Sequence, residues 1–377
     1  MSEQILTEGP LVPALLALLE EPRHRARDIV MVADPTLVAL GRLAPLERAL
    51  AGTGRSADCF TSFSPNPSLG QVRDLAARLR GRSPIVVIIG GGSALDTGKL
   101  AAVLAGADDD LPSVLGVDLS AIRRPSTLIA IPSTAGTGAE ATRTAVVSDD
   151  EMRKRWAWGE GLRPDAVILD PALLQGLPPK FLVWTGLDAL VHAIEAASHR
   201  WADTRTKAWA CDAISIILAA LPACLDDPRD EARRQAMLQG AYLAGRAIDR
   251  AGTGAAHAIS HGMASVIECH HGAVVAAALA VCLRANLVAA AESFVEVATR
   301  FGVIPADLPL AYERFLDRVG FEWPALVGAD GERALSEVMA EDNRPMRDHN
   351  AARFEAEDYR RFIERQTMAQ GASGGSA

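Results

Sequence analysis

The chain contains, over residues 85–99, the stretch Ile85-Val86-Val87-Ile88-Ile89-Gly90-Gly91-Gly92-Ser93-Ala94-Leu95-Asp96-Thr97-Gly98-Lys99. Its five consecutive β-branched residues predict a buried parallel strand. The glycines that follow allow a sharp turn and close backbone approach to a ligand, and the helix expected from about Ala94 would direct free N–H groups toward an anion. A nucleotide pyrophosphate fits such a site. A tight strand-to-helix turn without a ligand would show the same pattern, so the interpretation needs a second feature.

A second group of polar residues lies further along the chain in apolar, helical surroundings. Asp188 and His192 are four residues apart, a spacing that places both side chains on one face of a helix. His257 and His261 repeat this spacing, and His271 follows in a pair of histidines. One carboxylate with several imidazoles is a ligand set suited to Fe(II) or Zn(II). A single histidine is more often a core or surface residue, but the cluster favours a divalent metal site.

These segments together resemble the iron-containing (group III) alcohol dehydrogenases. The resemblance rests on the glycine loop, on Pro132-Ser133-Thr134-Ala135-Gly136-Thr137-Gly138-Ala139-Glu140-Ala141-Thr142, on the helix over 185–195 and on the run from His257 to Gly272. It implies an α/β N-terminal nucleotide-binding domain and an all-α C-terminal domain, an architecture shared with dehydroquinate synthase-like proteins. It also implies His261 near the nicotinamide and the substrate, and one divalent metal. The metal ligands that the resemblance implies are Asp188, His192, His257 and His271.

Cofactor-binding residues are expected at the glycine loop and at the end of the first strand. There Asp34 could accept hydrogen bonds from a ribose 2′-hydroxyl and would repel a 2′-phosphate. An Asp-Pro turn without a ligand is the alternative, but an acidic residue at this place in the family favours NAD(H) over NADP(H). For Asp96, a solvated ion pair with Lys99 is an alternative to contact with the cofactor. The predicted cofactor-binding residues are Asp34, Gly91, Gly92, Ser93, Asp96, Ser133, Thr134 and Thr137.

The composition agrees with a soluble two-domain enzyme. The 377 residues include 49% hydrophobic residues, and the net charge of −9 gives no electrostatic reason to expect nucleic acid or an anionic membrane as a partner. The N-terminus lacks signal-peptide features, and no uninterrupted apolar run approaches the length of a membrane span. We therefore expect a cytoplasmic protein, with a homodimer as the expected assembly. Five scattered cysteines without a CxxC pair favour reduced thiols.

The apolar periodicity divides the chain into two parts. Residues 1–176 are predicted to form the α/β dinucleotide-binding domain, residues 177–370 the all-helical metal-binding domain, and residues 371–377 a disordered tail. Strands of the expected parallel sheet are predicted over 28–33, 85–89, 127–131, 144–147 and 166–169, with helices over 71–80 and 94–105. Further helices are predicted over 181–199, 204–221, 230–249, 273–301 with a break, and 309–319.

The predicted function is a metal-dependent NAD(H) oxidoreductase that interconverts a small primary or secondary alcohol and its aldehyde or ketone. Fe(II), with Zn(II) as the alternative, would polarise the substrate oxygen, and His261 would relay the hydroxyl proton. A dehydroquinate synthase-like metal/NAD cyclase and a non-catalytic metal- or nucleotide-binding protein are the alternatives.

A basic segment near the C-terminus departs from the family pattern. The cluster Arg344, Arg347, His349 and Arg353 suggests an aldehyde that carries a carboxylate or phosphonate, since guanidinium groups suit planar oxyanions. A solvated surface loop, balanced by neighbouring acidic residues, is the alternative.

Overall fold

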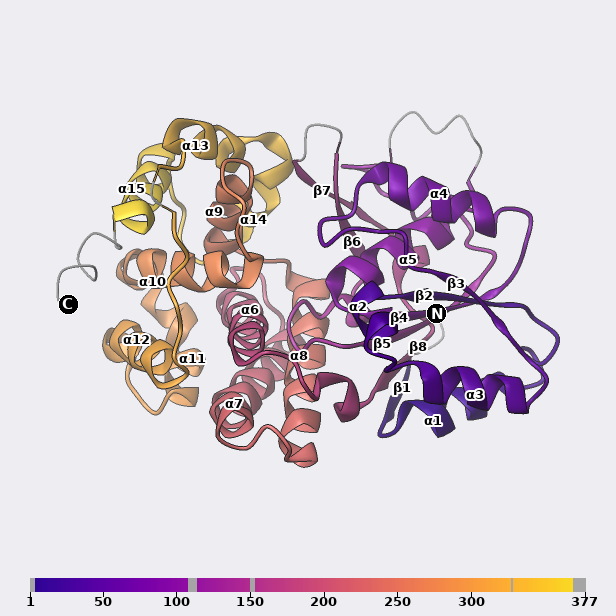
Figure 1. Ribbon diagram of the computed structural model, residues 1–377. Coiled ribbons are helices and arrows are strands. Elements are labelled where there is room, and N and C mark those ends of the chain that lie inside the picture. The colour runs from indigo at the N-terminus through magenta and orange to yellow at the C-terminus, as the bar shows by residue number, and fades with distance from the viewer. Residues whose placement is uncertain (1–3, 108–113, 150–152, 327, 369–377) are drawn as a thin grey trace. The chain divides into compact units, whose positions relative to one another are not determined.

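The computed structural model describes residues 4–107, 114–149, 153–326 and 328–368, which fall into two compact units (Figure 1). The first unit comprises Met1–Thr134 and Gly138–Gln175, and the second comprises Ala135–Thr137 and Gly176–Ala377. The tail predicted to be disordered, 371–377, lies outside the described residues.

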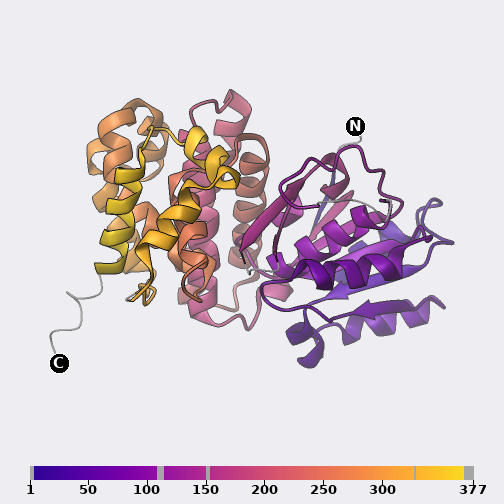
Figure 2. The ribbon, with the colours of Figure 1, turned by 90° about the horizontal axis from the view of Figure 1, so that it is seen from above.

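A six-stranded parallel sheet forms the centre of the first unit, with strand order β1-β8-β5-β4-β2-β3. Figure 2 shows this sheet with helices on its two faces. Strand β4 pairs with β2 on one side and with β5 on the other, which explains why its apolar residues are buried on both faces. The strands are β1 (Ile5–Glu8), β2 (Ile29–Ala33), β3 (Ala57–Phe60), β4 (Ile85–Gly90), β5 (Thr127–Pro132) and β8 (Ala166–Leu169). The helices are α1 (Leu11–Leu19), α2 (Pro35–Ala39), α3 (Ala44–Gly52), α4 (Leu69–Leu79) and α5 (Gly92–Leu104).

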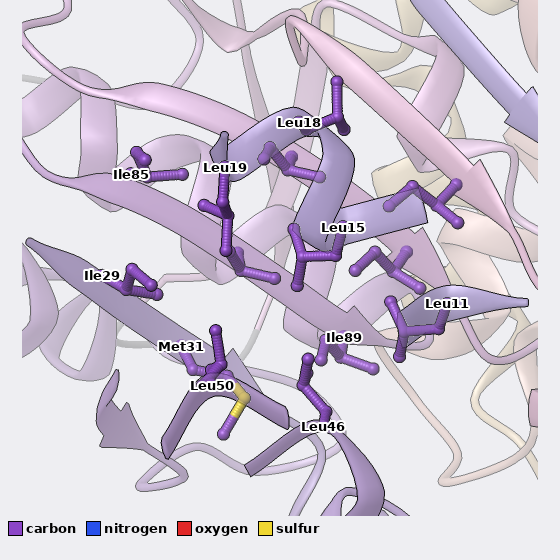
Figure 3. Packing of buried hydrophobic residues seen from close by; sticks show 14 of the residues in the cluster. Leu11, Leu15, Leu18, Leu19, Ile29, Met31, Leu46, Leu50, Ile85 and Ile89 are labelled. Carbon is purple, nitrogen blue, oxygen red and sulfur yellow. The ribbon is translucent and has the colours of Figure 1, made fainter. Parts of the chain in front are cut away.

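A cluster of buried apolar residues covers one face of the sheet. Alternate residues of β2 and β4, such as Met31 and Ile89, pack there against leucines of α1 and α3, including Leu15 and Leu50 (Figure 3). On the other face, α5 approaches β4 so closely that a Cβ atom added at Gly98 would lie 2.6 Å from Ile88 Cδ1. Helix α5 begins at Gly92, two residues after the end of β4, and packs tightly against that strand.

One predicted strand is placed differently in the structure. The run over 144–147 does form a strand, β6 (Thr144–Ser148), but it pairs antiparallel with β7 (Lys154–Trp158) in a separate two-stranded sheet. The prediction that it joins the parallel sheet was wrong, because the short connection to β7 permits a hairpin, whereas parallel strands need a long crossover.

The described residues of the second unit form helices joined by loops, with no strand among them. Helix α6 packs against α7, α8 and α10. The long helices are α6 (Pro179–Ser198), α7 (Thr204–Asp226), α8 (Glu231–Ala251) and α10 (His271–Ala290), and the shorter ones are α9 (Ala255–Ala264), α11 (Val295–Arg300), α12 (Leu308–Arg318), α13 (Gly331–Met339), α14 (Arg344–His349) and α15 (Ala356–Met368). The break predicted within 273–301 is present as a 3-10 turn, Ala291–Phe294.

Two helical stretches of this unit are apolar enough in length and composition to cross a membrane. They are Thr204–Asp226 and His271–Arg300, and 50% and 61% of their most apolar windows are buried inside the structure. Both pack against α6, as expected of core helices in a helical domain.

Candidate functional site

Helix α6 carries the first two residues of the predicted metal site. Asp188 and His192 lie one helical turn apart and are buried, with 3% and 5% of their surface exposed. The Asp188 Oδ1 atom lies 3.8 Å from His192 Nε2. A carboxylate and an imidazole are rarely buried in an apolar helix without a partner, so these two side chains are expected to face further polar or charged groups.

Two further histidines reach the same carboxylate from other helices. His257, in the first turn of α9, places Nε2 3.7 Å from Asp188 Oδ1, and His271, at the start of α10, places its Nε2 3.8 Å away. The rings of His192 and His257 are stacked with their centroids 4.5 Å apart. Ligand atoms of Asp188, His192 and His257 all lie within 4.8 Å of one another. The four predicted ligands therefore meet in space although they come from three separate helices.

The donor atoms fit a divalent cation. Asp188 Oδ1 and His257 Nε2 are buried and have no hydrogen-bond partner among the residues that the structure describes. The distances of 3.7–3.8 Å from Asp188 Oδ1 to the Nε2 atoms of His192, His257 and His271 are too long for hydrogen bonds. They are close to the distance of about 3.3–3.6 Å between ligands that each lie about 2.0–2.2 Å from a tetrahedral ion. Nitrogen and oxygen donors without a thiolate suit Fe(II) or Zn(II).

The electrostatics of the group also favour a cation. Burial would raise the pKa of Asp188, but His192, His257 and His271 hold that pKa well below its usual range. Burial lowers the pKa of His192 to about 4, which keeps its imidazole neutral and able to ligate. Burial alone would also lower the pKa of His257, yet the carboxylates of Glu195 and Asp188 raise it to about 9. The two buried carboxylates thus favour a positive charge at this place, which either a protonated His257 ring or a bound cation can supply.

Glu195 is a residue of this site that the sequence reasoning missed. It is 6% exposed, and its Oε2 atom accepts a hydrogen bond of 2.6 Å from His257 Nδ1. Burial opposes ionisation, but His257 and two backbone N–H groups lower the pKa of this carboxyl. A signal was present in the sequence, because Glu195 follows His192 by three residues in an otherwise apolar helix.

His261 lies one turn beyond His257 on α9. Its ring is 5.8 Å from that of His271 in an edge-on arrangement, and it is half-buried. His271 Nδ1 shares a hydrogen bond of 3.0 Å with Ser260 Oγ, which holds that ring in place. The proton-relay role of His261 stays a prediction.

The glycine turn in the first unit lies where β2, β4 and β5 end. Ser133 N–H donates to Gly90 O at 3.0 Å, and Thr134 contacts the position where Gly91 would carry a Cβ atom. A Cβ atom at Gly90 would lie 3.2 Å from Asp34 Cβ. Helix α5 begins at Gly92 without a side-chain cap. Open N–H groups at the carboxyl ends of parallel strands are typical of a dinucleotide-phosphate site.

Two of the remaining predicted cofactor-binding residues, Asp34 and Ser93, form hydrogen bonds within the protein. Asp34 caps α2, and its Oδ1 accepts from Thr36 N–H at 2.8 Å. Ser93 Oγ donates to the carbonyl of Pro65. Thr137 belongs to the second unit. Their roles in cofactor binding stay predictions.

Asp96 and Lys99 form a buried pair on α5. The Asp96 side chain is only 13% exposed, lies 3.6 Å from Lys99 Nζ and accepts from Val146 N–H at 3.1 Å. Lys99 is fully buried and donates to Ala139 O and Thr142 Oγ1. The alternative of a solvated ion pair was therefore wrong, because both groups face β6 and the turn before it. Contact between Asp96 and the cofactor stays a prediction.

Arg344, Arg347 and His349 of the basic segment lie on helix α14, whereas Arg353 lies in the irregular segment after it. Arg344 pairs with Glu341 and Asp348, and Arg347 donates to the carbonyls of Val338 and Ala340 at the end of α13. These two arginines are thus held by the protein itself.

Comparison with known families covers most of the chain. Residues 13–171 match the iron-containing alcohol dehydrogenase family, and residues 182–320 match the C-terminal domain of the Fe-containing alcohol dehydrogenase family. The chain belongs to the iron-containing alcohol dehydrogenase family. It is therefore an oxidoreductase of this family, and the predicted resemblance and two-part fold are confirmed.

Individual relatives agree with this assignment. The chain is 35% identical over 271 residues to the probable alcohol dehydrogenase EutG of Salmonella typhimurium, covering 71% of this chain and 68% of that protein. It is 31% identical over 296 residues to lactaldehyde reductase of Escherichia coli, covering 77% and 76%. Among solved structures, sulfoacetaldehyde reductase from Bifidobacterium kashiwanohense in complex with NAD+ is similar with a TM-score of 0.85 and 25% identity, covering 97% and 98%.

Proposed function

We propose that this enzyme is a metal-dependent NAD(H) oxidoreductase that interconverts a small primary or secondary alcohol and its aldehyde or ketone. The observation that carries the proposal is the buried group of Asp188, His192 and His257, in which Asp188 Oδ1 and His257 Nε2 have no hydrogen-bond partner within the described parts of the chain. The alcohol dehydrogenase and aldehyde reductase relatives support it.

The residues of the second unit would hold one divalent ion, Fe(II) or Zn(II). A bound ion would supply Lewis-acid polarisation of the substrate oxygen, and a bound nicotinamide would exchange the hydride. Asp188, His192, His257 and His271 would hold the ion. His192 serves this role near neutral pH because burial lowers its pKa to about 4. Half-buried beside His271, His261 would pass the hydroxyl proton to solvent.

The residues of the first unit would bind NAD(H). Gly91, Gly92 and Ser93 would face the pyrophosphate from the uncapped start of α5, with the hydroxyls of Ser133 and Thr134 beside them. The described hydrogen bonds of Asp34 engage Oδ1, which leaves its second oxygen for a ribose 2′-hydroxyl. The similar structure that contains NAD+ supports this choice of cofactor.

An aldehyde that carries an anionic group is a second candidate substrate, favoured by the similarity to sulfoacetaldehyde reductase. The internal hydrogen bonds of Arg344 and Arg347 give it no support. The deciding comparison is kcat/KM for an uncharged short aldehyde and for its carboxylate analogue. A preference for the charged compound would favour this narrower function.

The experiment that tests the proposal is an anaerobic screen of NADH oxidation over short aldehydes with Fe(II) and with Zn(II). Steady turnover supports the proposed function. Metal and nucleotide binding without turnover would favour a binding protein, and one internal oxidation and reduction without net NADH use would favour a cyclase. A cytoplasmic homodimer remains the prediction for location and assembly, and light scattering of the purified chain tests the assembly.

A further inference from the structure

The start of helix α9 is held by side chains from two distant segments. Glu195 of α6 accepts from Gly254 N–H through Oε2 and from Ala256 N–H through Oε1, both at 2.7 Å. Asn350, just after α14, accepts from Ala255 N–H at 3.2 Å. Three N–H groups that a helix leaves without internal partners are therefore satisfied, and the carboxylate lies at the positive end of the helix.

Glu195 contacts a predicted metal ligand at the same time. Its Oε2 atom accepts from His257 Nδ1 at 2.6 Å, and His257 Nε2 then faces Asp188 Oδ1. A carboxylate that already accepts two backbone N–H bonds acts as an acceptor, so Nδ1 must carry a proton in this contact. When the ring loses its second proton, as a metal ligand must, its lone pair therefore lies on Nε2, the atom that faces Asp188 Oδ1.

We propose that Glu195 is a positioning residue for the metal site, which fixes both the tautomer and the orientation of His257. This inference rests on the proposed metal site. No other residue could replace Gly254 at this place without movement, since a Cβ atom there would lie 2.9 Å from Asn350 Oδ1 and 3.0 Å from Glu195 Oε1. The loop before α9 thus packs against the Glu195 carboxylate, which orients His257.

The substitution Glu195→Gln tests the role with little change in volume. The NH2 group of the new glutamine cannot accept a hydrogen bond, so at least one of the N–H groups bound to the carboxylate loses its acceptor. The same NH2 group can also donate to Nδ1 of His257, which leaves the proton of that ring on Nε2 and prevents Nε2 from binding a metal. We expect Zn2+ affinity of the full chain, measured by competition with a chelator, to fall about 10–100-fold.

Asn350→Ala is the matched control. It removes the acceptor of Ala255 N–H and loosens the same helix start, but it leaves the His257–Glu195 contact in place. We expect it to lower the melting temperature of the metal-free chain while Zn2+ affinity stays close to that of the wild type. If both variants lose affinity in step with melting temperature, Glu195 is only a helix cap and the inference is overturned.

A second measurement keeps the inference testable if Glu195→Gln does not fold. In the zinc-loaded wild type, histidine ring 15N spectra should show a protonated Nδ1 and a zinc-bound Nε2 for His257, and zinc on Nδ1 would overturn the inference. Equal Zn2+ affinity in wild type and Glu195→Gln would overturn only the positioning role. A wild type that binds no Zn2+ would overturn the proposed metal site itself.

Discussion

The contact between α6 and the start of α10 leads to a prediction about Gly272. This residue follows His271, and a Cβ atom added to it would lie 2.2 Å from the carbonyl oxygen of Trp184 and 3.2 Å from Asp188 Cβ. A carbon–oxygen distance of 2.2 Å is more than about 1 Å inside ordinary contact. Since the obstacle is backbone, no side chain can rotate away, and the two helices must separate. We expect Gly272→Ala to lower the free energy of unfolding by about 1–3 kcal/mol.

This loss corresponds to a fall of roughly 2–12 °C in the melting temperature of a unit of this size. Because the clash with Trp184 is close to Asp188 on α6 and next to His271 on α10, Zn2+ affinity should fall as well. The control is Gly52→Ala at the end of α3, where a Cβ atom meets nothing within 4 Å and should stabilise the helix slightly. Differential scanning fluorimetry with and without Zn2+ measures both effects. A Gly272→Ala variant that melts and binds Zn2+ like the wild type would show that the close approach of the helices is incorrect.

Three further predictions concern the first unit. Asp34→Gly should relax the preference for NAD(H) over NADP(H) by about 1–3 kcal/mol in the ratio of kcat/KM values, and equal use of both cofactors by the wild type would contradict the role of Asp34. Burial raises the pKa of Glu140 from 4.5 to about 7, so its contribution to stability is complete below pH 4.5 and lost as pH rises through 7. Between pH 5 and 8, the free energy of unfolding of Glu140→Gln in urea should therefore rise relative to that of the wild type by about 1–3 kcal/mol. Parallel pH dependences of the two proteins would refute this prediction. Lys99→Met should lower the free energy of unfolding by about 3–5 kcal/mol, because it leaves Asp96 and buried acceptors unpaired; an unchanged urea midpoint would argue against the buried pair.

Local patterns predicted the central part of the fold. The β-branched run of β4 and the glycines after it were sufficient to place a strand, a turn and α5, and the apolar period identified α6. The edge strands β1 and β3 were not predicted, since each has only four residues and ADCF contains no β-branched residue. They gain their conformation from pairing with β8 and β2. Tertiary context decides such strands.

The site was predictable only in part for the same reason. Asp188 and His192 share a helix turn, which the sequence shows directly, whereas the approach of His257 and His271 came from the family resemblance. The acceptor role of Asn350 could not be inferred, because it lies 95 residues from Ala255, whose N–H it accepts. The arginines near Asn350 were predicted to bind an anionic substrate group, yet Arg347 donates to the carbonyl of Ala340 at the end of α13.

The most direct test of the metal site is the metal content and NADH-oxidation rate of His257→Ala beside the wild type. Metal-free wild type should be inactive and should recover turnover with one Fe(II) or Zn(II) per chain. The variant should bind no ion at this site and show no turnover, while its circular dichroism stays that of a folded helical protein, because the helical unit has its own apolar core. A variant that keeps both one ion per chain and the wild-type rate would contradict the assignment of His257 as a ligand and the mechanism that depends on it.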